Sequence, residues 1–461
     1  MVFLFGFLPA VLVCYFLLPA RWRTGRNTVL LIFSLAFYCW GGVALLPALL
    51  VSCVGNWAAA LWAAPGRRGR KAVYGIALAG NLLMLGYFKY TGFLLENLQA
   101  LGLDVTVPSI ALPAGISFFT FQAMAYLTDV YRGTIPAERS LPRLTLFMAF
   151  FPQLLQGPIL RYGEFAPALT QRQENSEDAA AGATRFCFGL AKKVLLADSL
   201  GVIADAAFSS GDRLTMSLAW LGGIAYTLQL YFDFSGYTDM AIGLGRIFGF
   251  RLPENFNYPY ISASVTEFWR RWHMSLGSWF RDYVYIPLGG NRKGQVRTYV
   301  NLLIVFFATG LWHGAGATFI IWGLYHGLFL VVERMGLGKL LEKNCFRGLN
   351  HIYTALVVVV GWVFFRADTL ADAKVILHQM FTWENGIYPA SLFVNPKVIF
   401  LAVLGVLLSG IAQSICPKLR EHLYEKEVTK TVDIVIMAVL LFLCTMYLVS
   451  STYNPFIYFR F

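Results

Sequence analysis

His313 is the residue whose surroundings most favour chemistry among the six histidines of this sequence. It stands in the segment Thr309-Gly-Leu-Trp-His-Gly-Ala-Gly316, which is flanked by apolar runs. It follows Arg297 by 16 residues, or about 24 Å of helix, and a bilayer core is about 30 Å thick. An ionisable side chain at membrane depth is a functional candidate by default. The alternative is a histidine that packs between helices and bonds to a carbonyl group.

His273 is a second candidate, in the segment Phe268-Trp-Arg-Arg-Trp-His-Met-Ser-Leu276. If this segment is helical, Trp269 and Arg270 lie on the same face as His273, one turn earlier. A nearby guanidinium disfavours the imidazolium, so the ring would stay neutral and could bind a substrate or accept a proton. The alternative is an aromatic and arginine anchor in the membrane interface.

Other polar side chains in apolar surroundings are weaker candidates. His326 follows His313 by 13 residues, about 220° around a continuous helix, so packing is the favoured interpretation. Asp233 and Asp239 lie near the end of an apolar run, where carboxylates pair or line cavities. A structural role for them is at least as well supported as a catalytic one.

Several kinds of site are missing from the sequence. It contains no GxSxG, Walker A, HExxH or dinucleotide-binding motif, so nothing indicates a nucleophilic serine, ATP or a bound cofactor. Its seven cysteines lie singly, without the spacing of a disulfide framework or a zinc site. No metal is predicted.

The composition indicates a protein that crosses the membrane several times. The 461 residues are 57% hydrophobic and only 13% charged, whereas soluble domains carry about 25% charged residues. The net charge is +12, but the basic residues fall in short loops between apolar runs. This is the positive-inside pattern of membrane topology and no sign of nucleic-acid binding.

The apolar runs predict about 11 or 12 crossings within one integral domain, 1–461. The basic loops 20–27, 65–71 and 131–143 are expected in the cytoplasm, which places the N-terminus outside. The run 144–160 contains Pro152 and Pro158, so a broken or re-entrant element is expected there. The predicted runs are 2–19, 28–45, 47–64, 72–90, 110–130, 144–160, 186–208, 215–240, 299–313, 315–332, 351–366, 396–415 and 432–450.

Residues 251–297 are basic and rich in aromatic side chains, and a cytoplasmic segment lying in the interface is predicted. Such a vestibule suits an anionic donor, either an acyl-CoA or an acyl carrier protein. Two classes of function fit the residues: a membrane-embedded transferase that uses histidine, and a transporter. A transporter predicts repeated halves, which the sequence does not show.

Several long motifs resemble the membrane-bound O-acyltransferase (MBOAT) family, in particular a bacterial branch that includes the membrane subunit of alginate O-acetylation. The resemblance runs nearly from end to end. The motifs are Phe151-Pro-Gln-Leu-Leu-Gln-Gly-Pro-Ile159, Tyr231-Phe-Asp-Phe-Ser-Gly-Tyr-Thr-Asp-Met-Ala-Ile-Gly243, Asn255-Phe-Asn-Tyr-Pro-Tyr260, Glu267-Phe-Trp-Arg-Arg-Trp-His-Met-Ser-Leu276, Trp279-Phe-Arg-Asp-Tyr-Val-Tyr-Ile-Pro-Leu-Gly-Gly-Asn-Arg292, Gly310-Leu-Trp-His-Gly-Ala315 and Asn454-Pro-Phe-Ile-Tyr-Phe-Arg-Phe461.

This resemblance implies a ring of tilted membrane helices around a central funnel, in a bacterial cytoplasmic membrane. It also implies that His313, in the region 299–332, matches the family's catalytic histidine and that His273 is a second one. Substrate contacts are expected from Trp312, Arg270, Asn255, Asp233 and Trp269.

The implied reaction moves an acetyl group from acetyl-CoA, as co-substrate, to a hydroxyl group, for O-acetylation of an extracytoplasmic polysaccharide. The expected acceptor is a hydroxyl on an extracytoplasmic protein of the SGNH-hydrolase type, or another acceptor protein. Two alternatives stay open: D-alanyl transfer from a carrier protein toward teichoic acid, and a flippase or transporter of acylated material.

Overall fold

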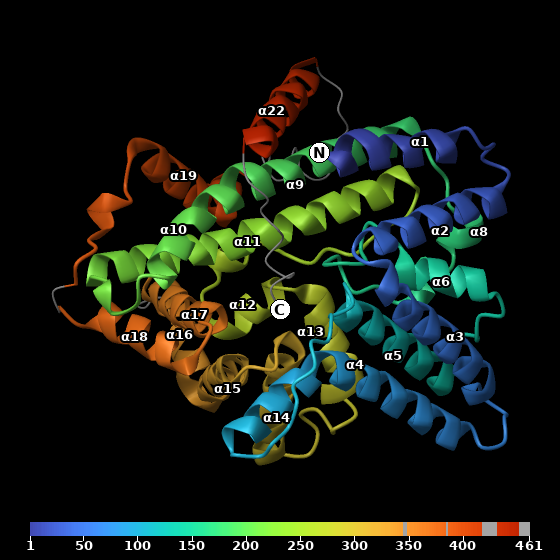
Figure 1. Ribbon diagram of the computed structural model, residues 1–461, viewed down its shortest axis with the longest axis horizontal. Helices are drawn as coiled ribbons and strands as arrows, with labels where there is room; N and C mark the ends of the chain where they lie inside the picture. The colour runs from blue at the N-terminus through green and yellow to red at the C-terminus, as the bar shows by residue number, and fades with distance from the viewer. Residues whose placement is uncertain (344–347, 384–385, 417–430, 451–461) are drawn as a thin grey trace. The chain divides into compact units, whose positions relative to one another are not determined.

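The computed structural model describes residues 1–343, 348–383, 386–416 and 431–450, and this part of the chain forms helices and no strand (Figure 1). The predicted all-α class is confirmed. The chain divides into two compact units, Met1–Ala183 with Ala241–Pro253, and Thr184–Met240 with Glu254–Phe461. A single domain over residues 1–461 stays a prediction.

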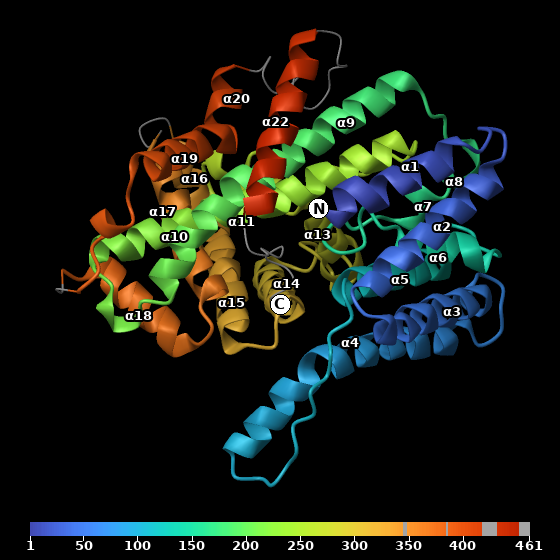
Figure 2. The same ribbon diagram turned by 45° about the horizontal axis from the view of Figure 1, so that its top comes forward.

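The first unit contains the N-terminal helices. In it α3 packs against both α4 and α5, and Figure 2 shows the three side by side. The C-terminal part of α4 extends beyond its neighbours (Figure 2). The helices are η1 (Phe3–Phe7), α1 (Leu8–Phe16), α2 (Arg23–Trp40), η2 (Val43–Leu45), α3 (Leu46–Ala63), α4 (Arg70–Ala100), α5 (Ile116–Arg132), α6 (Leu141–Ala149), α7 (Tyr162–Phe165), α8 (Ala168–Gln171) and the start of α9 (Ser176–Ala191).

The predicted interruption of the run 144–160 is confirmed. Helix α6 ends at Ala149, and turns follow it through residue 157. The chain there is buried, so its backbone groups need protein partners. One is supplied by Ser34 of α2, whose hydroxyl oxygen accepts the backbone N–H of Phe151 at 3.1 Å. The irregular backbone here is therefore covered by protein.

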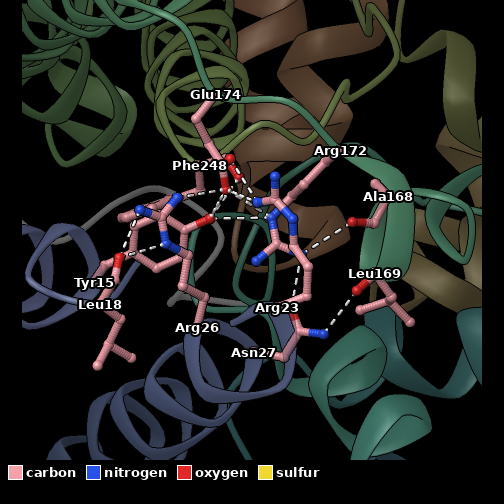
Figure 3. A network of polar contacts seen from close by, with 10 residues as sticks. All are labelled: Tyr15, Leu18, Arg23, Arg26, Asn27, Ala168, Leu169, Arg172, Glu174 and Phe248. Atoms are coloured by element: carbon pink, nitrogen blue, oxygen red, sulfur yellow. Dashed lines mark hydrogen bonds and ion pairs between the residues drawn. The ribbon is translucent and has the colours of Figure 1, made fainter. Parts of the chain in front are cut away.

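A network of charged side chains ties α1 and α2 to the segment after α8 (Figure 3). Glu174 accepts a hydrogen bond from Arg23 and lies 3.1 Å from Arg26 and 3.3 Å from Arg172. The Tyr15 hydroxyl lies 2.5 Å from the same carboxylate. Burial alone would raise the pKa of Glu174, but the bonds from Arg23 and Tyr15 lower it to about 2. The carboxylate thus stays charged among three guanidinium groups.

The second unit carries the predicted site residues. Its helices pack in sequential pairs, α14 with α15, α15 with α17, and α17 with α18. Its elements include η3 (Lys192–Ala197), α10 (Asp198–Phe208), η4 (Gly211–Arg213), most of α11 (Met216–Ile247), η5 (Pro259–Ile261), α12 (Val265–Arg271), α13 (Met274–Phe280), η6 (Arg281–Tyr285), α14 (Gln295–His313), α15 (Ala317–Val332), η7 (Glu333–Leu337), α16 (Gly338–Leu341), α17 (Leu349–Arg366), α18 (Leu370–Phe381), η9 (Ala390–Leu392), α19 (Pro396–Val406), η10 (Leu407–Ile411), α20 (Ala412–Ile415) and α22 (Thr431–Ser450).

Five helical stretches in the described residues are long and apolar enough to cross a membrane. Shorter apolar helices occur at Phe3–Phe16 and Ile434–Ser450. The number of crossings, about 11 or 12, and the outside N-terminus stay predictions. The five stretches are Val43–Ala63, Arg70–Ala100, Ala317–Leu341, Leu349–Arg366 and Pro396–Ile415.

Candidate active site

His313 is the last residue of α14 and is buried, with 6% of its surface exposed. Its ring packs edge-on against Trp322 of α15 and Phe365 of α17, both with ring centroids 5.0 Å away. Trp312, the preceding residue, is 4.7 Å away. The predicted catalytic histidine therefore lies inside the helix bundle of the second unit, held by three aromatic rings.

Close packing of α14 and α15 creates this position. A Cβ atom on Gly323 of α15 would lie only 2.3 Å from the backbone oxygen of Phe306 in α14. Only glycine permits that approach, as small residues do between membrane helices. The helices therefore touch through their backbones just before the turn that carries His313.

His273 lies at a break between α12 and α13 and has a left-handed backbone, with φ of 45°. The side-chain oxygen of Asn255 lies 3.0 Å from His273 Nδ1. The same oxygen accepts hydrogen bonds from the backbone N–H and the hydroxyl of Ser275, at 3.2 and 2.9 Å. A backbone N–H can only donate, so this Asn255 atom is the acceptor and His273 Nδ1 carries the proton. Nε2 is then the basic nitrogen of the ring.

The segment is not one continuous helix, because α12 ends at Arg271, Trp272 is extended, and the left-handed His273 precedes α13. The neutral ring stays a prediction, and burial favours it rather than the cause that the sequence suggested. His273 lies outside the candidate membrane spans, and burial lowers its pKa to about 3. Proximity to Arg270 is not the reason.

Trp312 connects the two histidines. Its ring centroid lies 4.7 Å from that of His313 and 6.1 Å from that of His273. Two residues that are 40 positions apart in the sequence thus share one aromatic neighbour. Of the predicted substrate contacts, Trp312 is the one that touches both rings.

A cavity of about 1470 Å³ reaches this region within the second unit. His273, Trp269 and Thr309 line it, together with residues of α12, α13 and α14. Its basic lining residues are Arg270, Arg281, Arg334 and Lys343, and its acidic ones are Glu267, Glu333 and Glu342.

The charges of this cavity leave a positive surplus. Arg281 pairs with Asp282 at 2.8 Å. Arg270, Arg334 and Lys343 form no ion pair with any residue that the structure describes. An anionic ligand entering the cavity would therefore meet cations that are not already neutralised.

Glu333 is a cavity-lining residue that sequence reasoning missed. Its carboxylate accepts the backbone N–H groups of Val265 and Thr266 at 2.7 and 2.8 Å. It thereby caps the N-terminus of α12, the helix that carries Trp269 and Arg270 into the cavity wall. Its signal in the sequence is a lone acidic residue directly after the apolar run 315–332.

Asp233 has a partner in the structure that the sequence reading did not name. Lys193 lies 2.6 Å from Asp233 and also 2.6 Å from Asp198. Asp239 pairs in the same way with Arg185 of α9 and Lys192 of η3. These ion pairs join α11 to the α9–η3–α10 segment and favour the structural interpretation of both aspartates.

Comparison with known proteins shows which family this chain resembles. Residues 134–371 match the MBOAT, membrane-bound O-acyltransferase, family. The chain is 46% identical over 392 residues to the probable alginate O-acetylase AlgI of Azotobacter vinelandii, covering 83% of this chain and 78% of that protein. It is 35% identical over an alignment of 513 residues to the peptidoglycan O-acetyltransferase of Helicobacter pylori, covering 100% and 96%.

A less similar relative is named for the transfer of a different acyl group. The chain is 32% identical over 262 residues to the teichoic acid D-alanyltransferase of Bacillus subtilis, covering 54% of this chain and 66% of that protein. All three relatives are named as acyl-transferring enzymes, and the family match includes both His273 and His313. This chain therefore belongs to the membrane-bound O-acyltransferase family and is a multi-pass membrane acyltransferase.

Proposed function

We propose that this enzyme transfers an acetyl group from acetyl-CoA on the cytoplasmic side of a bacterial inner membrane to an extracytoplasmic hydroxyl group. The final product is an O-acetylated secreted polysaccharide. An SGNH-type partner protein supplies the hydroxyl that receives the acetyl group first. The observation that carries the proposal is a pair of buried histidines that share Trp312 as a neighbour. One of them, His273, lines a cavity in which Arg270, Arg334 and Lys343 form no ion pair with any described residue.

The cavity is the proposed site for the donor. Coenzyme A carries several phosphate groups, and Arg270, Arg334 and Lys343 offer cations without an acidic partner among the described residues. Arg and Lys bind phosphate through charge-assisted hydrogen bonds. The donor's acyl end would reach inward past His273, whose position is fixed by Asn255.

His313 is the proposed general base. Its imidazole takes the proton from the acceptor hydroxyl while the hydroxyl oxygen attacks the carbonyl carbon of the thioester. The C–S bond then breaks, and the departing thiolate takes the proton back from His313. The new ester and a free thiol are the products, so no metal or bound cofactor is needed in this scheme.

The relatives support acetyl over D-alanyl as the transferred group. The two relatives named for O-acetylation match 83% and 100% of this chain, whereas the D-alanyltransferase matches 54%. D-Alanyl transfer from a carrier protein is therefore the less supported alternative, and the turnover assay described below distinguishes the two donors.

The first prediction is that His313→Ala abolishes acetyl transfer in purified protein in nanodiscs supplied with radiolabelled acetyl-CoA and the acceptor protein. We expect a loss of at least about 10²-fold, as is usual for a positioned general base. His378→Ala is the matched control, because His378 is an exposed histidine of α18 and should retain full activity.

Full turnover by His313→Ala would contradict the proposed mechanism. Turnover with a D-alanyl carrier protein, but not with acetyl-CoA, would replace the proposed donor.

A further inference from the structure

His326 is a buried histidine for which the proposed chemistry has no use. It lies in the middle of the apolar helix α15 and has no exposed surface. Neither of its ring nitrogens has a hydrogen-bond partner among the residues that the structure describes. A neutral imidazole always carries one N–H donor and one acceptor nitrogen. The sequence favoured a packing role, but packing does not explain these polar atoms.

Two tryptophans beside His326 share this property. The ring of Trp269, from α12, lies 5.0 Å from His326, and the ring of Trp322 lies 5.5 Å from it. The two indole rings are 5.6 Å apart, so the three rings contact one another. The indole N–H of each tryptophan is also buried without a partner in the described part of the chain. Three rings in mutual contact thus hold buried N–H groups that bond to no described protein atom.

A purely structural cluster would be better built from apolar rings. Leaving a buried donor unsatisfied costs free energy, whereas an apolar side chain of the same shape carries no such cost. His326 is also tightly enclosed, because a Cβ atom on Gly361 of α17 would lie 2.4 Å from its Nε2 atom. The chain therefore provides space for a polar ring at this position although no described residue bonds to it.

The cluster lies between the donor cavity and the proposed base. Trp269 lines the cavity. Trp322 is 5.0 Å from the ring of His313. A group moving from Trp269 toward His313 would therefore pass the rings of this cluster.

We propose that Trp269, Trp322 and His326 form a binding site for a hydrogen-bond-accepting oxygen, which during the reaction is the carbonyl oxygen of the acyl thioester. This inference rests on the proposed function, since it assigns the residues that stabilise the developing oxyanion. N–H donors fixed in a site without water are the usual means of doing so.

The step is an ordinary acyl transfer. The acceptor oxygen forms a bond to the carbonyl carbon, its proton goes to His313, and the π electrons of the C=O bond move to the carbonyl oxygen. The N–H groups of the cluster hold this oxyanion. The C=O bond then reforms, the C–S bond breaks, and the leaving thiolate takes the proton from His313.

The second prediction concerns His326→Phe, which keeps a ring of similar shape and removes both nitrogens. With the thioester donor that supports wild-type turnover, we expect kcat to fall about 10²-fold, as for the loss of one oxyanion donor. The KM for the donor should change little. The melting temperature without donor should stay equal or rise, because an unsatisfied polar group has been removed.

Tyr325→Phe is the matched control. It removes a hydroxyl group from the adjacent residue, whose ring lies 5.2 Å from His326 but whose hydroxyl already bonds to the backbone oxygen of Val357. This variant should keep its kcat. Unchanged kcat in His326→Phe, or a fall in kcat matched by a fall in melting temperature, would overturn the inference.

A binding measurement separates a carbonyl oxygen from a buried water molecule as the occupant. S-Acetonyl-CoA keeps a carbonyl group and cannot be transferred, and S-propyl-CoA lacks the carbonyl. Wild type should bind the acetonyl analogue about 10-fold more tightly, and His326→Phe should bind both equally. No preference in the wild type, or a preference that persists in the variant, would contradict the proposal. Loss of turnover in His313→Ala tests the proposed base separately.

Discussion

At the scale of single residues, one asparagine fixes both a side chain and a turn of the backbone. The side-chain oxygen of Asn255 bonds to the ring of His273, and its backbone oxygen accepts the N–H of Met274 at 2.9 Å. His273 itself has a left-handed φ of 45°, a conformation that Asn tolerates better than most residues. His273→Asn therefore keeps the turn and removes only the imidazole.

The third prediction is that His273→Asn makes stability less sensitive to acid. The unfolded histidine has a pKa of about 6.5, whereas the folded pKa of His273 is about 3. Below pH 6.5 the unfolded chain binds a proton that the folded chain does not. The folded wild type therefore loses about 1.4 kcal/mol per pH unit from this group as pH falls from 6.5 toward 3.

Thermal unfolding in detergent at pH 7.5 and pH 5 measures this difference. The melting temperature of wild type should fall more than that of His273→Asn between the two values. Equal falls would show that His273 is protonated in the folded protein.

A candidate residue was predictable from the sequence where its side-chain type is unusual for its surroundings. His313 could be found because an ionisable residue is rare within an apolar run. The left-handed turn at His273 could not, because its flanking residues read equally well as a helix. Its anchor, Asn255, lies 18 positions earlier, and no local pattern links the two. The partner of Asp233 was missed for a similar reason, since Lys193 lies on another helix.

At the scale of elements, the short helix α12 depends on a carboxylate from the end of α15. Glu333 accepts the N–H groups of Val265 and Thr266 and also the Thr266 hydroxyl, at 2.6 Å. Two otherwise unpaired N–H groups of the first turn are thus satisfied. The negative charge also suits the positive end of the helix dipole.

The fourth prediction is that Glu333→Gln destabilises the protein and weakens donor binding. The amide replaces one acceptor oxygen by a donor facing backbone N–H groups, a change that costs about 1–3 kcal/mol. The melting temperature should fall and the KM for the donor should rise, since α12 forms part of the cavity wall. Glu342→Gln is the control, because Glu342 lines the same cavity but is exposed. An equal effect of the two substitutions would refute the role of the cap.

Most long helices were predictable from apolar runs, because burial in lipid demands about 20 apolar residues per crossing. The interruption of the run 144–160 followed from its prolines. The end of α4 was not predictable in this way. The apolar run ends near residue 90, yet the helix continues to Ala100, because helical hydrogen bonds do not require apolar side chains.

At the scale of the whole molecule, α4 separates a basic loop from a neutral one. Its 31 residues span Arg70–Ala100, about 46 Å, which exceeds the 30 Å core of a bilayer. The loop before it contains Arg67 and Arg68, and the segment after it contains Asp104. The positive-inside rule therefore places the first loop in the cytoplasm and the second outside.

The fifth prediction tests this topology by cysteine labelling with a reagent that does not cross membranes. In a chain whose seven cysteines are replaced by alanine, Asp104→Cys should be labelled in spheroplasts with an intact inner membrane. Arg68→Cys should be labelled only after the membrane is permeabilised. The reverse pattern would invert the predicted orientation.

The bonds between α12 and Glu333 can form only late in the synthesis of the protein. Val265 and its acceptor Glu333 are 68 residues apart in the chain. At about 5–20 residues per second, a ribosome needs several seconds to add the stretch between them. During this interval α12 has its local cap from Ser264, which accepts the N–H of Glu267, but not the bonds from Glu333. The wall of the proposed donor cavity is therefore completed only after α15 and Glu333 have been made.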